Sequence, residues 1–290
     1  MDVDFDFSDV DSFFDEGEWS ETAPVLQQYA YIYHYDKYNR CIYKKLPGCD
    51  PVYTVYDAAD HPVFTQDGEQ RERNEWSFSI PDAFGRTVLT GVCTNTLDYV
   101  SNSLDTIIVY ADWAKEENGL KGYQLKGVTL ESPCLLSANY YDHYEFLGKN
   151  GIPNDMTTVY VEETGYGKRN AGGYKGQLTG IWTSLLSARP GTFTYSVMYY
   201  DDRYRIIQQR GNNELGGTEI VHTAYNFSGN PLEEKRIHTF PGTGPTVELH
   251  RHTYDHANRL LKTSYQLNDN TPIVSVSYTH LRAHETVLDL

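Results

Sequence analysis

The chain has 290 residues and a formal net charge of −16, from 40 acidic and 24 basic side chains. This acidic balance argues against a nucleic-acid partner, which is bound through Lys and Arg that displace counterions, and no apolar run approaches the length of a membrane span. Hydrophobic residues make up only 39% of the sequence while tyrosines number 25, so large rings with a polar hydroxyl supply much of the apolar surface.

Residues 1–24 form an acidic leader, with nine Asp or Glu and no Lys or Arg in residues 1–21. Apolar residues alternate with Asp here, which predicts a strand with one charged face. A solvated edge strand or disordered leader is favoured over a calcium loop. The loop would lack its central Gly and closing Glu, although some ligand offsets are occupied, at Asp4, Asp6, Ser8 and Asp15. The basic and apolar regions of a signal peptide are also missing.

Residues 25–93 are predicted to hold the first hairpins. Four tyrosines alternate with other residues over 29–35, which is typical of a strand. The strand leads into Tyr35-Asp36-Lys37-Tyr38-Asn39-Arg40, where Asp36 can bond the backbone of a turn and Asn39 can adopt positive φ. Residues 81–86 repeat this pattern with Asp82, Gly85 and Arg86. Pro47-Gly48 and Asp67-Gly68 mark further turns.

Residues 94–137 interrupt the pattern and are interpreted as an insertion between two repeat blocks. A short β-branched run covers 106–110, and residues 111–118 could form one or two helical turns. Strand, turn and loop are expected from there to residue 133.

Residues 138–275 resume the hairpins. Tyr200-Asp201 is followed by Arg205, and a complete copy is formed by Tyr254, Asp255, Asn258 and Arg259. Looser copies occur at Tyr56-Asp57, Tyr141-Asp142 and Tyr225-Asn226, the last with Gly229 at the turn. Neighbouring copies are about 20–30 residues apart outside two longer gaps, which is the mark of a repeat architecture. We therefore expect an array of nearest-neighbour contacts with no single dense core.

Residues 276–290 are interpreted as a non-native tail, because VSYTHLRAHET resembles a reading frame through a sequencing adaptor. The alternative is a genuine strand that ends in a short amphipathic tail. His280, His284 and Glu285 have spacing suited to metal ligands but are excluded with the tail. On this interpretation the natural protein is longer than the chain.

Other candidate sites are weak. Gly165–Gly176 lacks the spacing of a phosphate loop and is interpreted as a long hairpin loop. His250, His252 and His256 are the best metal candidate, yet no carboxylate is placed to orient them, so ordinary sheet surface is favoured. Cys41 and Cys49 could bridge across a hairpin, but unpaired thiols are favoured for all four cysteines, Cys41, Cys49, Cys93 and Cys134. No nucleophile signature stands out, so we expect no enzyme, cofactor or metal.

The repeated Tyr-Asp-x-x-Asn/Gly-Arg turns resemble the YD-repeat (RHS-repeat) family over residues 29–93 and 138–268. The turns depart from the family pattern at Asn39 and Asn258, where Gly is usual, at Pro81, where Tyr is usual, and at the degenerate turns near Asp60 and Glu145. These departures indicate irregular hairpins within the same fold.

The resemblance implies an all-β fold, in which repeated antiparallel β-hairpins form part of a spiralling single-layer sheet that closes into a shell. It also implies a non-catalytic module whose shell encloses or presents a cargo, as in bacterial toxin-delivery proteins or cell-surface adhesion proteins. The implied partner is the remainder of a longer chain, and the implied location is secreted or cell-surface. The family's self-cleaving segment is not recognisable here. The alternative function is a carbohydrate-binding or adhesion module, which the Tyr-rich strands would suit.

Overall fold

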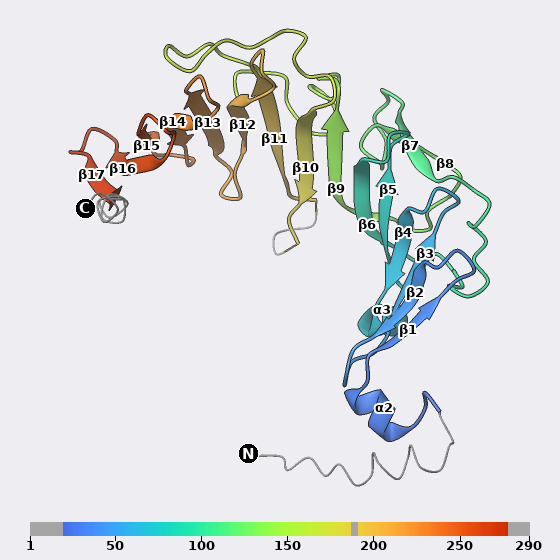
Figure 1. Cartoon of the computed structure of the whole chain (residues 1–290). Helices are drawn as coiled ribbons and strands as arrows, with labels where there is room; N and C mark the ends of the chain where they lie inside the picture. Colours follow the sequence, from blue (N-terminus) through green and yellow to red (C-terminus); the bar gives the residue numbers. More distant parts are fainter. Residues whose placement is uncertain (1–19, 187–190, 278–290) are drawn as a thin grey trace, which may run out of the picture. The chain divides into compact units, whose positions relative to one another are not determined.

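A computed structural model describes residues 20–186 and 191–277. Seven residues singled out in the sequence lie outside these ranges, namely Asp4, Asp6, Ser8, Asp15, His280, His284 and Glu285. The described chain divides into two compact units (Figure 1). Unit 1 comprises the described residues up to Trp113 together with Tyr123–Leu136, and unit 2 comprises Ala114–Gly122 and the described residues from Ser137.

Unit 1 is a sheet of antiparallel hairpins whose strand order follows the chain from β1 to β6. Its strands are β1 (Ile32–Tyr35), β2 (Cys41–Lys45), β3 (Val52–Tyr56), β4 (Pro62–Gln66), β5 (Trp76–Pro81) and β6 (Thr87–Cys93). A separate antiparallel pair is formed by β7 (Tyr110–Trp113) and β8 (Tyr123–Lys126).

Unit 2 continues the same construction, again with strand order equal to chain order. Its strands are β9 (Cys134–Tyr141, which begins in unit 1), β10 (Leu178–Ser184), β11 (Phe193–Tyr200), β12 (Ile206–Asn212), β13 (Thr218–Tyr225), β14 (Pro231–His238), β15 (Thr246–Tyr254), β16 (Leu260–Leu267) and β17 (Ile273–Ser277). The prediction of an all-β fold built from antiparallel hairpins is confirmed.

Two short helices were not predicted, α2 (Pro24–Tyr29) and α3 (Gly68–Arg73). The tyrosine strand is therefore shorter than expected, because Tyr29 ends α2 and β1 begins at Ile32. Asp67-Gly68 starts a helix instead of a tight turn. Asp67 Oδ1 accepts the backbone amide of Gln70 at 2.8 Å, and Gln70 Oε1 accepts the backbone amide of Asp67 at 3.1 Å, which forms a capping box.

The insertion after β6 covers one face of the unit 1 sheet, and the expected helical turns at residues 111–118 are wrong. The segment instead forms the β7–β8 pair, and β7 lies against β5. Ala111 of β7 and Val109, which directly precedes β7, are buried, as are Phe78 and Ile80 of β5. A dense core therefore exists in unit 1, contrary to the expectation of an array without one.

A long connection plays the same part in unit 2. Tyr141-Asp142 does not form a tight turn as expected, because residues 142–177 are inserted between β9 and β10 and pack on the sheet. We call residues 142–177 the strap. Phe146 of the strap is fully buried and stacks on Tyr140 with ring centroids 4.3 Å apart. Gly165–Gly176 lies in this strap, so its interpretation as a long loop agrees with the structure.

The last strands, β15 to β17, are less covered. Thr263 is the one residue of these strands that is buried within the described chain, so the expectation of nearest-neighbour contacts holds here. β17 runs to Ser277 and pairs Val276 with Thr263, so the strand includes the first two residues of the expected non-native tail.

Close packing under the strap can be tested at Gly180 in β10. A Cβ added there would lie 2.3 Å from Phe146 Cζ, so Gly180→Ala should displace the ring and lower the free energy of unfolding by about 1–3 kcal/mol. Gly244→Ala is the matched control, because an added Cβ meets nothing within 4 Å. Urea unfolding of both variants measures the difference, and equal stabilities would contradict this packing.

Candidate functional site

Five turns hold an aspartate carboxylate in nearly the same hydrogen bonds. At the first turn, Asp36 Oδ1 accepts the backbone amides of Tyr38 and Arg40, both at 2.9 Å. Asp36 Oδ2 accepts Arg40 Nε at 2.6 Å. The same three contacts recur at Asp82, Asp201 and Asp255. They recur also at Asp57, where His61 Nδ1 takes the place of the arginine Nε. The carboxylate satisfies backbone donors that a two-strand turn otherwise leaves open.

The residue three positions after each aspartate has a left-handed backbone. The positions expected from sequence have φ of 63° at Asn39, 82° at Gly85, 91° at Gly229 and 60° at Asn258. Sequence reasoning missed two further positions, Asp60 with φ 62° and Tyr204 with φ 61°. A tyrosine in this region is uncommon, because its Cβ crowds the backbone, so residue type alone did not identify the site.

A tyrosine just before four of the turns links that turn to an earlier strand. Tyr56 Oη donates to the carbonyl of Cys41 at 3.2 Å, and Tyr200 Oη donates to that of Leu178 at 2.6 Å. Two further copies do the same at 2.9 Å, from Tyr225 to Ile206 and from Tyr254 to Pro231. Every acceptor is the first residue of a strand, so the hydroxyl fixes where the preceding turn ends.

Two of the turn arginines, Arg40 and Arg205, reach along the sheet to the next turn. Arg40 Nη1 donates to the carbonyl of Asp57 at 2.8 Å, and its guanidinium lies 5.1 Å from the centre of the Tyr56 ring. Arg205 makes the same two contacts with the turn that follows it. Its Nη1 donates to the carbonyl of Asn226 at 3.0 Å, and its guanidinium lies 4.7 Å from the centre of the Tyr225 ring. We call this set of Tyr, Asp and Arg contacts the turn ladder. It gives the recurring motif a structural task at the turns.

Asparagine forms the same turn at places the motif search missed. Asn213 Oδ1 accepts the amides of Leu215 and Gly217, and Asn118 Oδ1 accepts those of Leu120 and Gly122. The available signal was an Asx residue three positions before a Gly or other residue with positive φ. These copies lack Tyr and Arg, so they close hairpins without joining the turn ladder.

The unit 1 insertion is anchored on the ladder. Asp57 is fully buried, and its Oδ2 accepts the amide of Val109 at 3.0 Å. Arg40 also bonds Asp105 of the insertion, with Nη2 to Oδ1 at 2.7 Å. Tyr99 of the insertion stacks on Tyr53 with ring centroids 4.0 Å apart. The turn residues therefore hold both the sheet and the segment that covers it.

The turn contacts lower the pKa of three of the aspartates, Asp36, Asp201 and Asp255. Burial opposes the charged form of Asp201, but the amide and guanidinium of Arg205 and the amide of Arg203 together lower the pKa of Asp201. The pKa of Asp36 is lowered against burial by the corresponding groups of Arg40 and Tyr38. At the partly buried Asp255, hydrogen bonds from Arg259 are the main cause of a lowered pKa. These carboxylates are thus poorly suited to proton transfer near neutral pH.

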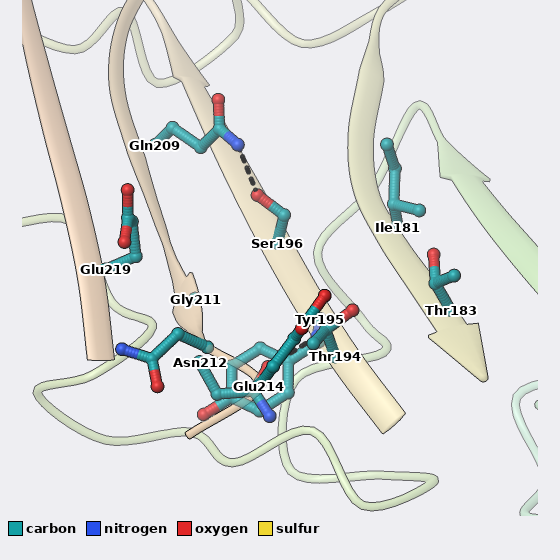
Figure 2. A pocket seen from close by; sticks show the side chains of 11 residues that line it. Ile181, Thr183, Thr194, Tyr195, Ser196, Gln209, Gly211, Asn212, Glu214 and Glu219 are labelled. Carbon is teal, nitrogen blue, oxygen red and sulfur yellow. Dashed lines mark hydrogen bonds between the residues drawn. The ribbon is translucent and has the colours of Figure 1, made fainter. Parts of the chain in front are cut away.

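A polar groove of about 360 Å³ lies over β10 to β13 (Figure 2). Gly211 lines it, and because a Cβ added there would collide with the backbone carbonyl of Tyr195, the glycine lets β11 and β12 approach closely. Figure 2 shows Gln209 donating to Ser196, a hydrogen bond of 2.7 Å across β11 and β12. The charged side chains that line the groove are both acidic, Glu214 and Glu219. Such a lining suits a hydroxyl-rich or cationic group and disfavours an anion.

The candidate histidines take part in separate contacts. His252 Nδ1 lies 3.0 Å from Thr263 Oγ1, while the His250 ring packs against Tyr265 with centroids 5.0 Å apart. Within residues 20–186 and 191–277, no group of three or more His, Cys, Asp or Glu is arranged to hold a metal ion. The four cysteines are free thiols. No helix in the described part of the chain has the length and apolar character needed to cross a membrane.

Neither a family model nor a curated protein matches the sequence. Among solved structures, the chain is similar to the crystal structure of TcdB2-TccC3-Cdc42, with a TM-score of 0.21 and 11% identity over 87% of this chain. It is also similar to TcdB2-TccC3 without its hypervariable C-terminal region, with a TM-score of 0.21 and 10% identity over 88%. A third similarity is to the Photorhabdus luminescens Tc holotoxin pore with a mutated TccC3, with a TM-score of 0.16 and 10% identity over 91%.

The chain spans only 15% to 20% of the length of these three proteins. TM-scores this low carry no argument about function. Function must therefore be inferred from the contacts of this chain itself.

The turn carboxylate can be tested at Asp201, which is buried, against its exposed neighbour Asp202. Asp201→Asn keeps an acceptor for the turn amides but loses the ion pair with Arg205, whose Nη2 lies 2.6 Å from Asp201 Oδ2. The substitution should therefore lower the free energy of unfolding at pH 7 by about 1–2 kcal/mol. Asp202→Asn should change little. Urea unfolding measures both.

The same substitution has a defined pH dependence. Because the folded pKa of Asp201 is lowered, its stabilisation is present above the unfolded pKa of about 3.9 and is lost as pH falls through the folded value. The difference between wild type and Asp201→Asn should therefore shrink on going from pH 7 to strongly acidic solution. A difference that stays constant with pH would rule out the ionised carboxylate as its cause.

Asn258 tests the left-handed position. Asn258→Val should lower the free energy of unfolding by about 1–2 kcal/mol, because a β-branched residue resists positive φ. Asn258→Gly should be nearly neutral. Ala257→Val, at an exposed neighbour with ordinary φ, controls for the added side chain. Thermal unfolding of the three variants checks the order, and a Val variant as stable as the Gly variant would refute it.

Proposed function

We propose that the protein is a non-catalytic structural repeat module, a section of a β-shell that encloses or presents a cargo. The observation that carries this proposal is the turn ladder. Four of its tyrosines and two of its arginines bond neighbouring strands or turns, so these characteristic side chains of the motif serve to build a sheet. The pKa values of Asp36, Asp201 and Asp255 are lowered by turn contacts that include their arginines, and we infer no catalytic role for the ladder aspartates.

The two edges of the array support the proposal. Within the described residues, β1 pairs with β2 alone and β17 with β16 alone. The side chains of both edge strands stay partly uncovered, with Tyr33 and Tyr35 of β1 42% and 55% exposed, and Ile273 and Val274 of β17 61% and 53% exposed. A strand with unpaired backbone groups and apolar side chains is a template for another strand. We infer that further hairpins of a longer chain occupy these edges.

The cargo, the location and the source remain part of the proposal. A toxin-like cargo, a bacterial origin and a secreted or cell-surface location all follow from the resemblance of the motif to YD repeats. The partner is the remainder of the protein's own longer chain.

Edge pairing predicts self-association of the chain when it is studied alone. Sedimentation velocity of the full 290-residue chain should show concentration-dependent oligomers. The double variant Ile273→Lys/Val274→Lys should reduce them, because charge on an edge strand blocks strand addition. Leu215→Lys/Phe227→Lys is the matched control, since these residues are 64% and 85% exposed but lie in turns. A stable monomer, or an equal effect of both doubles, would refute the edge model.

A carbohydrate-binding surface module is the second candidate, and the polar groove favours it. Hydroxyl and amide groups of Thr183, Thr194, Ser196 and Gln209 line the groove together with the two acidic side chains, and these groups suit a neutral sugar. Glycan-array binding that is lost in Gln209→Ala but kept in Gln266→Ala, which lies outside the groove, would favour this function over the shell.

A further inference from the structure

A single glutamine holds the middle of the strap to the sheet of unit 2. Gln208 of β12 is 1% exposed. Its Nε2 donates to the carbonyl of Val161 at 2.7 Å, while its Oε1 accepts the amide of the same residue at 3.0 Å. Both backbone groups of one strap residue therefore depend on the orientation of one side-chain amide.

His222 of β13 fixes that orientation. Its Nδ1 lies 3.1 Å from Gln208 Nε2, and the imidazole is 3% exposed. An amide nitrogen can only donate, so Nδ1 must accept and the ring must be neutral. Rotating the Gln208 amide by half a turn gives no alternative, because its oxygen would then face the carbonyl of Val161. Protonated Nδ1 would be a donor facing a donor.

The surroundings of His222 disfavour its charged form. Tyr166 of the strap packs against the ring with centroids 5.3 Å apart. Arg210 of β12 is buried, and its Nε has no hydrogen-bond partner within the described residues. The positive charges of Lys235 in β14 and of Arg210 disfavour protonation of His222, while the negative charge of Glu163 in the strap favours it.

Two other strap residues near His222 bond charged side chains of β14. Lys235 Nζ bonds Glu163 Oε1 at 2.6 Å, and Tyr166 Oη donates to Glu233 of β14. The hydrogen bond from Lys235 is the main cause of a lowered pKa at Glu163. At Glu233, burial is outweighed by Tyr166 and Arg251, which lower its pKa. Both carboxylates therefore keep their charge in mild acid, and His222 is the facing group that changes.

We propose that His222 is an acid-operated latch, whose protonation breaks the bond to Gln208 and releases the strap from the face of β11 and β12. Release would uncover aromatic surface, including Tyr199, whose hydroxyl donates to the carbonyl of Thr158 in the strap at 2.6 Å. The latch is built within unit 2 and does not depend on the shell proposal.

The sign of the pH effect follows from burial. Burial lowers the pKa of His222 from 6.5 to about 4. Between these values the released or unfolded state takes up a proton that the closed state excludes, so closure weakens as pH falls from 6.5 to about 4 and changes little below. The ratio of closed to released strap should fall on the order of a hundredfold between pH 7 and pH 4.

Hydrogen exchange of the full chain tests the latch. The Val161 amide should lose protection as pH falls from 7 to 4, after correction for the intrinsic exchange rate. His222→Asn should largely abolish this loss, because its Oδ1 can replace Nδ1 as an acceptor and does not titrate. His252→Asn is the matched control. His252 bonds the Thr263 hydroxyl, which can accept as well as donate, so its protonation breaks no contact of this kind.

Two results would overturn the proposal. One is equal acid loss in wild type and His222→Asn, which would assign the response to another group, such as the partly buried His143 near the base of the strap. The other can be read on the wild type even if the variant fails to fold. An NMR titration in which His222 has a pKa of its ordinary value while the strap stays protected would show that its protonation does not open the strap.

Discussion

The bond between a turn aspartate and its own following backbone is the interaction on which the rest of the structure depends. A hairpin alone is marginal in water, and its turn leaves amide groups without partners. One carboxylate oxygen accepts two of those amides, and the other accepts the arginine or histidine that follows, as at Asp36 and Asp57. Because the aspartate fixes the arginine, the arginine can in turn reach the next hairpin.

This arrangement makes stability pass from neighbour to neighbour. Arg40 contacts the turn of Asp57, and Arg205 contacts the turn of Asn226, so each hairpin is held by the one beside it. Tyrosine suits the turn ladder beside Asp and Arg, because its ring supplies apolar contact while its hydroxyl reaches a backbone carbonyl. The abundance of tyrosine in an otherwise polar chain has a structural reason.

The two longest interruptions of the repeat provide what the repeat lacks. Hairpins with partly polar faces bury little apolar surface by themselves, and β15 to β17 remain partly exposed. The insertion of unit 1 and the strap of unit 2 each cover sheet residues and create a core. In unit 2 that cover is attached through buried polar groups, Gln208, Arg210 and His222, which makes the attachment sensitive to charge.

The sequence alone determined the hairpin class and most of the hairpin turns, because each of these turns is encoded within about six consecutive residues. It also contained the capping box at Asp67 and Gln70, although the Asp-Gly pair there suggested a turn. Only the tertiary structure decided which segments cover which strands. Val161 meets Gln208, and Asp57 meets Val109, across separations of 47 and 52 residues. No local pattern specifies such contacts, because they depend on the shape and polarity of the whole sheet face.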